Sequence, residues 1–225
     1  MRKYLVFDLD DTLYPEREYV LSGFRAVSEY ISNTYGVGGV YELAVGYLNQ
    51  GIRGDIFDRC LETLFGRSEK FLVAKLVNVY RNHNPNITFF PDAHQLLKVH
   101  AQSTPIAIIT DGYAEAQRKK ILALGLASIA RKIIVTDDWG RQFWKPNVRG
   151  YLEIEKFFDA SPDECVYVGD NPLKDFVTPK QRGWLTIQIN RVGGEYGSQQ
   201  VPDKYRADTV VDDLSTIAER FIDYQ

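Results

Sequence analysis

An apolar run followed by acids stands near the start of the sequence, as Tyr4-Leu5-Val6-Phe7-Asp8-Leu9-Asp10-Asp11-Thr12. Its apolar start is typical of a buried strand in a parallel sheet, and acidic residues follow where that strand ends. Alternate side chains of an extended chain point the same way, so we expect Asp8 and Asp10 to face one crevice. Two carboxylates that close repel each other, which indicates either a hard metal ion or a nucleophile beside an acid–base group. Solvated acids at a strand end are the alternative.

Four later segments begin with β-forming residues in the same way, at residues 105–112, 132–138, 165–171 and 184–189. Helical patterns occur at residues 92–100, 114–124, 148–158 and 214–222. Strands that alternate with helices predict an α/β fold, with a Rossmann-like parallel sheet covered on both faces. In such a sheet the ligand crevice lies at the carboxyl ends of the strands.

Residues 14–88 break this alternation, because they read almost wholly as helix. Pro15 suits the first position of a helix, and Gly36 ends the apolar stripe that follows it. Further helical patterns cover residues 56–65 and 71–80. The sequence therefore predicts an all-helical domain, residues 14–88, inserted into an α/β core of residues 1–13 and 89–225.

Composition excludes several classes of partner. The chain has 225 residues, 44% of them apolar, and 27 basic against 30 acidic residues give a net charge of −3. No positive surplus exists to neutralise the phosphates of a nucleic-acid polymer, and no apolar run approaches the ~18 residues of a membrane span. Cys60 and Cys165 lie outside any CxxC pattern, which favours reduced thiols and a cytoplasmic location. No GxxxxGK[ST] or GxGxxG loop supports a nucleotide-driven kinase or a dinucleotide oxidoreductase.

Polar groups at the ends of the second and third predicted strands support a functional interpretation of the acidic pair. Thr110, followed by Asp111 and Gly112, offers a hydroxyl and backbone N–H groups at the start of a helix, where an anion binds readily. Lys145 lies in the irregular segment 144–147, from which an ammonium can face the same crevice. A helix cap and a surface charge are the structural alternatives.

The fourth predicted strand runs into the sequence Gly169-Asp-Asn-Pro-Leu-Lys-Asp, which contains Asp170 and Asp175. An ordinary turn would explain this segment alone. Four sets of polar groups in order, each at a strand end, are much less expected by chance than any one of them.

With these motifs the sequence resembles the haloacid dehalogenase-like hydrolase superfamily. Its members carry a DxDxT motif, a Ser or Thr, a Lys and a late GDxxxD-type motif. The resemblance spans nearly the whole chain, and the helical insertion is like the cap of members with a cap of the first type. One departure is Trp144-Lys145-Pro146-Asn147, which replaces the more frequent Lys-Pro-Asp.

The resemblance implies a Mg²⁺-dependent phosphatase with an aspartyl-phosphate intermediate. Asp8 would be the nucleophile, and Asp10 the general acid for the leaving alcohol and then the base for water. Thr110 and Lys145 would hold the transferring phosphoryl group. The implied ligands of Mg²⁺ are Asp8, the backbone carbonyl of Asp10 and Asp170, with Asp175 in support.

A small phosphorylated metabolite, either a sugar phosphate or a nucleoside monophosphate, is the expected substrate. Arg53, in a turn between Gly51 and Gly54, is the candidate to read its anionic group, and a solvated turn is the alternative. A phosphomutase, a phospho-acceptor module and a non-catalytic binding protein remain alternative functions. Dehalogenation is less favoured, because two-acid metal chemistry is superfluous for displacing a halide. The sequence gives no indication of oligomeric state.

Overall fold

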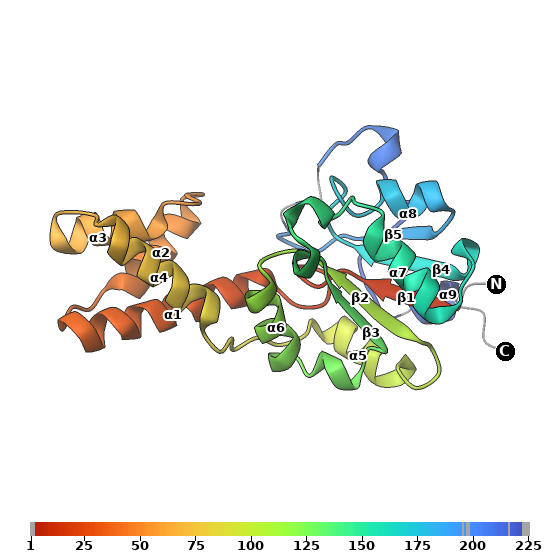
Figure 1. Ribbon diagram of the computed structural model, residues 1–225, viewed down its shortest axis with the longest axis horizontal. Helices are drawn as coiled ribbons and strands as arrows, with labels where there is room; N and C mark the ends of the chain where they lie inside the picture. Colours follow the sequence, from red (N-terminus) through yellow and green to blue (C-terminus); the bar gives the residue numbers. More distant parts are fainter. Residues whose placement is uncertain (1–2, 195, 197–198, 216, 222–225) are drawn as a thin grey trace. The chain divides into compact units, whose positions relative to one another are not determined.

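The computed structural model describes residues 3–194, 196, 199–215 and 217–221. Its contacts divide the chain into two compact units (Figure 1). The α/β unit comprises Met1–Pro15 and Thr88–Gln225, and the helical unit comprises Glu16–Ile87. Tyr14, Pro15 and Thr88 thus group with the α/β unit, whereas the sequence pattern places them in the insertion.

A six-stranded sheet organises the α/β unit (Figure 1). All neighbouring strands run parallel, in the order β3-β2-β1-β4-β5-β6. The strands are β1 (Tyr4–Phe7), β2 (Ile106–Thr110), β3 (Lys132–Val135), β4 (Cys165–Gly169), β5 (Leu185–Ile189) and β6 (Thr209–Val211). Every residue of β2 and β4 is buried, so both faces of the sheet are covered, and the predicted α/β fold is confirmed.

Among the described residues, five α-helices belong to this unit, and the last of them follows the final strand. They are α5 (Pro91–His100), α6 (Ala114–Ala123), α7 (Arg149–Phe158), α8 (Val177–Arg182) and α9 (Ile217–Phe221). The sequence pattern did not predict α8 or β6, because six and three residues are too few to show a period. Residues 216 and 222, within the helix predicted at 214–222, lie outside the described residues.

The strand order places the crevice. The chain runs from β1 outward through β2 and β3 and then returns to the other side of β1 with β4. Loops leave the two central strands in opposite directions at such a reversal, so a crevice opens at their carboxyl ends. Phe7 pairs with Val168, and the Asp8 amide donates to the Val168 carbonyl at 2.8 Å. Asp8 and Asp170 therefore follow adjacent strands at this reversal.

The α/β unit holds both ends of the inserted segment. The Phe90 amide donates to the Leu13 carbonyl at 2.9 Å. This bond joins the chain just before the helical unit to the chain just after it. The insertion therefore leaves and re-enters the α/β unit at neighbouring points.

Four helices form the helical unit: α1 (Glu16–Tyr35), α2 (Val40–Asn49), α3 (Ile56–Phe65) and α4 (Lys70–Asn82). Each contributes to one apolar core, with Phe24, Val27 and Ile31 repeating along the buried stripe of α1. Gly23 in α1 lies against Tyr80 in α4, so close that a Cβ there would be 2.4 Å from the Tyr80 ring. The absent side chain lets these two helices approach each other. In neither unit do the described residues form a helix long and apolar enough to cross a membrane.

Two helical glycines of this unit give opposite predictions. Gly23→Ala should lower the free energy of unfolding by about 1–3 kcal/mol, because the new methyl group overlaps the Tyr80 ring. Gly46→Ala, in α2, should raise the free energy of unfolding by about 0.5–1 kcal/mol, because alanine favours a helix. Apart from its two chain neighbours and the backbone of its own helix, no described residue has an atom within 4 Å of the position that the new Cβ would take. Urea unfolding followed by far-ultraviolet circular dichroism measures both. Equal stabilisation by the two substitutions would contradict the packing described here.

Candidate active site

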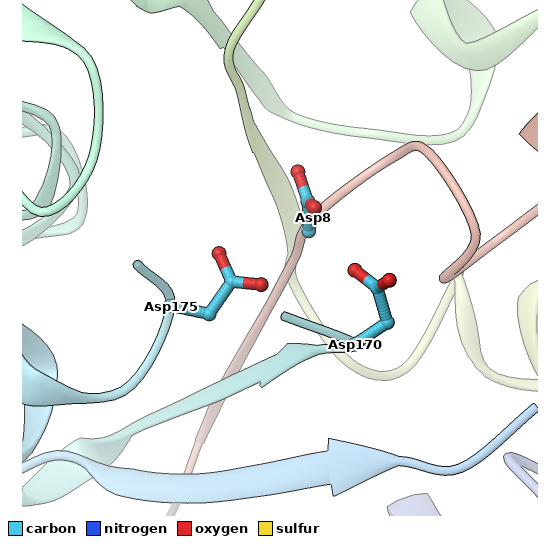
Figure 2. A group of neighbouring side chains, drawn as sticks. All are labelled: Asp8, Asp170 and Asp175. Carbon is cyan, nitrogen blue, oxygen red and sulfur yellow. The ribbon is translucent and has the colours of Figure 1, made fainter. Parts of the chain in front are cut away.

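Three buried carboxylates meet at the carboxyl ends of β1 and β4. Asp8 follows β1, Asp170 follows β4, and Asp175 ends the loop that begins at Asp170. One oxygen of each residue lies within 4.8 Å of the oxygens of the other two (Figure 2). The structure thus brings together three of the acids that the sequence analysis selected for the metal. Only oxygen ligands are present in this set, as Mg²⁺ prefers.

The loop between Asp170 and Asp175 is closed by its own hydrogen bonds. The Asn171 amide donates to Asp175 Oδ2 at 3.0 Å, and the Asp175 amide donates to the Asn171 carbonyl at 3.0 Å. A Cβ at Gly169 would lie 2.6 Å from Asp175 Oδ2, so only glycine leaves room for this carboxylate. These bonds hold Asp175 in the loop through Oδ2, and Oδ1 contacts Lys145.

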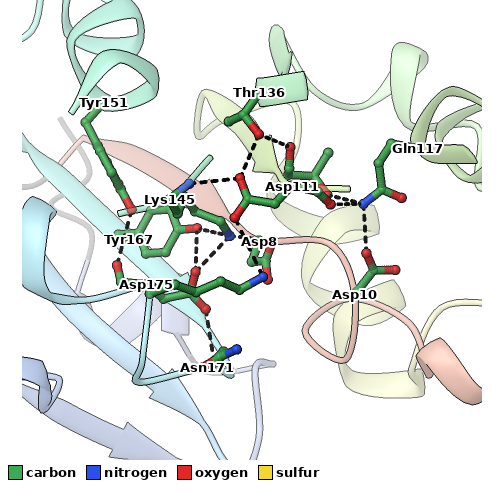
Figure 3. A network of polar contacts seen from close by, with 12 residues as sticks. Asp8, Asp10, Asp111, Gln117, Thr136, Lys145, Tyr151, Tyr167, Asn171 and Asp175 are labelled. Carbon is green, nitrogen blue, oxygen red and sulfur yellow. Dashed lines mark hydrogen bonds and ion pairs between the residues drawn. The ribbon is translucent and has the colours of Figure 1, made fainter. Parts of the chain in front are cut away.

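Lys145 lies between two of the acids (Figure 3). Its Nζ is 2.7 Å from Asp8 Oδ1 and 2.7 Å from Asp175 Oδ1, and it donates to the Tyr167 hydroxyl at 2.9 Å. Burial alone would lower the pKa of Lys145, but Asp175 and Asp8 outweigh that effect and hold it well above its usual value. The predicted ammonium is therefore charged and faces the crevice.

Asp170 completes the cluster without such a partner. Burial, followed by repulsion from Asp175 and Asp8, raises the pKa of Asp170 to about 9. Among the described residues, no side chain forms a hydrogen bond or ion pair with its carboxylate. Three buried acids thus share one close ammonium, and a divalent cation would offset the remaining negative charge. The donor set and its charge fit Mg²⁺.

Asp10 has different neighbours from Asp8. Its carboxylate accepts hydrogen bonds from the Tyr14 hydroxyl, from Lys120 Nζ at 2.6 Å and from Gln117 Nε2 at 2.8 Å. Burial would raise the pKa of Asp10, but the charge of Lys120 and the three hydrogen bonds outweigh it and lower the pKa. The two acids of this short motif thus lie in distinct environments, and the environment of Asp10 favours its ionised form.

Thr110 and Asp111 lie at the end of β2 and before α6. Thr110 is fully buried, and its hydroxyl oxygen accepts a hydrogen bond from Gln117 Nε2 at 2.7 Å. Asp111 Oδ1 accepts from the Thr136 hydroxyl at 2.7 Å and from the Lys145 amide at 3.0 Å (Figure 3). The Asp111 carboxylate thus braces the segment that carries Lys145, a role that the sequence analysis, which considered the backbone N–H groups, did not identify. Gly112 has a φ of 123°, a conformation that favours glycine in this turn.

Arg53 belongs to the helical unit. Its guanidinium donates to the backbone carbonyls of Leu48 at 3.1 Å and Ile52 at 3.0 Å. These bonds fasten the side chain to its own turn. Substrate recognition by Arg53 stays a prediction.

Five side chains near the selected residues were missed: Tyr14, Gln117, Lys120, Tyr167 and Lys174. Lys174 Nζ lies 3.8 Å from Asp111 Oδ2, which places a further cation beside the acids. Gln117 and Lys120 are three residues apart and share one face of α6, yet a polar helix face usually meets solvent. Only the buried position of that face distinguishes it, and the sequence does not show burial.

Comparison with known proteins shows which family the chain resembles. A family model for haloacid dehalogenase-like hydrolases matches residues 5–189. The glyceraldehyde 3-phosphate phosphatase of Methanocaldococcus jannaschii is 27% identical over 230 residues, which cover 97% of this chain and 96% of that protein.

Solved structures share the fold. The putative HAD hydrolase YfnB of Bacillus subtilis, bound to magnesium, has a TM-score of 0.68 and 17% identity, with 97% of each chain covered. A 2-haloacid dehalogenase of Pseudomonas syringae has a TM-score of 0.66 and 23% identity, again with 97% of each chain covered. The family match runs from Leu5 in β1 to the end of β5 and includes every predicted site residue, and it confirms the resemblance first seen in the motifs. The chain belongs to the haloacid dehalogenase-like hydrolase family.

Proposed function

We propose that this protein is a Mg²⁺-dependent phosphatase that hydrolyses a small phosphomonoester through an aspartyl phosphate on Asp8. The observation that carries the proposal is the buried contact of Lys145 with Asp8, beside Asp170 and Asp175. The phosphatase activity named for the relative from Methanocaldococcus supports it. Displacing a halide from carbon would leave Asp170 and the acid–base group Asp10 without a task.

The metal would be held by the carboxylates of Asp8 and Asp170 and by the carbonyl of Asp10, with Asp175 nearby. When bound, Mg²⁺ supplies positive charge that lets an anionic carboxylate approach an anionic phosphate. The Lys145 ammonium contributes charge on the same side. Asp175 and Tyr167 keep that ammonium in place through their contacts at 2.7 and 2.9 Å.

Two displacements at phosphorus complete the reaction. In the first, an Asp8 carboxylate oxygen forms a bond to phosphorus while the bond to the alcohol oxygen breaks, and that oxygen takes the proton of Asp10. In the second, water attacks the aspartyl phosphate, its proton passes to Asp10, and the bond from phosphorus to Asp8 breaks. Inorganic phosphate leaves, and both acids return to their starting forms. The covalent intermediate splits one difficult step into two easier ones.

For the substrate we propose a sugar phosphate of about triose size. The relative that acts on such a compound matches nearly the whole of this chain, the helical unit included. The helical unit would serve as a cap that excludes water, with Arg53 reading the anionic group. A nucleoside monophosphate is the other substrate class to test. A cytoplasmic location agrees with the two buried cysteines, which form no disulfide, and is part of the same proposal.

A substrate panel tests the reaction class. Purified protein should release inorganic phosphate repeatedly from glyceraldehyde 3-phosphate, and excess EDTA should abolish this release. Asp8→Asn should lower kcat by more than about 10⁴-fold, because an amide cannot act as the nucleophile. The control Asp203→Asn should match the parent, because Asp203 is 91% exposed. Full activity of Asp8→Asn, after mass spectrometry has excluded deamidation, would contradict the assignment, and an isomerised phosphate product would indicate a mutase.

Metal binding should depend on pH in a defined direction. The pKa of Asp170 is ~3.9 in an unfolded chain and about 9 in the folded protein. Protonation of this carboxyl group therefore favours the folded state, and the stabilisation is complete below the lower of the two values. The metal-free protein should therefore lose stability as the pH rises through this window, and Mg²⁺ should protect it more at about pH 8 than at about pH 5. Thermal melting with excess EDTA or MgCl₂ measures the effect. Asp170→Asn should remove most of it, and an unchanged pH dependence in this variant would contradict the site.

The role of Arg53 can be separated from a structural one. Arg53→Met should raise KM for the substrate about tenfold while kcat changes little, because uniform binding is lost. Arg67→Met, an exposed control in the same unit, should leave KM unchanged. A lower melting temperature with the same KM would show that Arg53 only fastens its own turn.

A further inference from the structure

Helix α6 carries two buried polar side chains that reach the site. Gln117 is 1% exposed and Lys120 is 4% exposed. Burial of an amide or an ammonium costs free energy unless the group finds good partners. Their partners therefore show what these side chains do.

Gln117 connects two groups that follow different strands. Its Nε2 lies 2.8 Å from Asp10 Oδ2 and also contacts the Asp111 carbonyl (Figure 3). Nε2 lies 2.7 Å from Thr110 Oγ1 as well, so its two hydrogens are shared among three acceptors. The reversed amide would place an oxygen against these acceptors, so the contacts fix its orientation. Gln117 Oε1 is buried and has no hydrogen-bond partner among the described residues. A buried acceptor without a partner opposes stability, so stability alone does not explain a glutamine here.

The contact orients the Thr110 hydroxyl. A hydroxyl has one hydrogen to donate and two lone pairs to accept. Because Thr110 Oγ1 accepts from Gln117, its hydrogen points elsewhere. That hydrogen is then available to a phosphoryl oxygen.

The contact with Gln117 is one of three that limit the directions in which the Asp10 carboxyl group can transfer a proton. A carboxylate has about four acceptor positions. Tyr14, Lys120 and Gln117 fill three of them, with the Lys120 ammonium only 2.6 Å from Oδ1. One position remains for the proton that passes to the leaving alcohol. A proton donor must lie within hydrogen-bond reach of the atom that it serves, so this restriction bears directly on the rate.

We propose that Gln117 and Lys120 are positioning residues: Lys120 fixes the Asp10 carboxyl group, and Gln117 aligns that group with the Thr110 hydroxyl. The inference rests on the proposed function and adds to it two residues that act through others. It predicts that loss of Lys120 affects only the step in which Asp10 transfers a proton. Loss of Gln117 affects that step and also the contact of Thr110 with the phosphoryl group.

Leaving groups of different basicity separate these effects. p-Nitrophenolate leaves without a proton, whereas the alkoxide of glycerol 3-phosphate needs one. The ratio kcat/KM reports the transfer to Asp8, so hydrolysis of the shared intermediate does not enter the comparison. Lys120→Met should lower kcat/KM at least tenfold for glycerol 3-phosphate and less than threefold for p-nitrophenyl phosphate. Gln117→Met should lower both, and the alkyl ester more.

Matched controls come from α5, where Lys98 and Gln95 are exposed. Lys98→Met and Gln95→Met should leave both substrates unchanged. In an Asp10→Asn background, Lys120→Met should cause no further loss with the alkyl ester, because the group on which it acts is gone. Equal losses on the two substrates, or a full further loss in that background, would overturn the proposal.

A stability cycle tests the contact without activity. The effects of Lys120→Met and Asp10→Asn on the free energy of unfolding should not add, because each substitution removes the same ion pair. Additive effects would overturn the positioning role. A parent protein that releases no phosphate from either ester would instead overturn the proposed function, and the cycle would still decide the contact.

Discussion

The Lys145 ammonium contacts Asp8, Asp175 and the Tyr167 hydroxyl, and these buried contacts hold the site together. These residues come from β4 and from the loops after β1, β3 and β4, so the charges meet only if the central strands keep their register. Buried charges are costly without partners, and removal of one partner leaves another uncompensated. The sheet order, the glycine at position 169 and the Asp111 brace all serve to keep this contact intact.

Asp8 and Asp10 lie in different electrostatic environments. The two acids are neighbours in one motif, yet burial raises the pKa of Asp8, with Lys145 opposing it, whereas Lys120 and three hydrogen bonds lower that of Asp10. Different environments thus distinguish two acids of one motif, and in the metal-free protein the directions of the two pKa shifts favour a proton on Asp8 over one on Asp10. α6, a helix that resembles an ordinary solvated helix in sequence, supplies much of this difference.

The sequence was sufficient where a local pattern carried the information. Apolar runs followed by acids located β1 and β4, and with them Asp8 and Asp170, because a buried strand must end where polar groups begin. Contacts between distant residues left no such pattern. Lys120 meets Asp10 across 110 positions and Gln117 meets it across 107, and neither side chain is unusual for its helix. Burial, not residue type, gives them their significance.

The hydrogen bond between Phe90 and Leu13 has an evolutionary consequence. It closes the α/β unit at the point where the helical segment departs, and Asp8, Lys145 and Asp170 all belong to the unit that it closes. Selection could exchange, lengthen or reshape the inserted segment with little disturbance to the loops that carry Asp8, Lys145 and Asp170. Recognition and chemistry can then diversify at separate rates, and one catalytic framework can acquire many substrates.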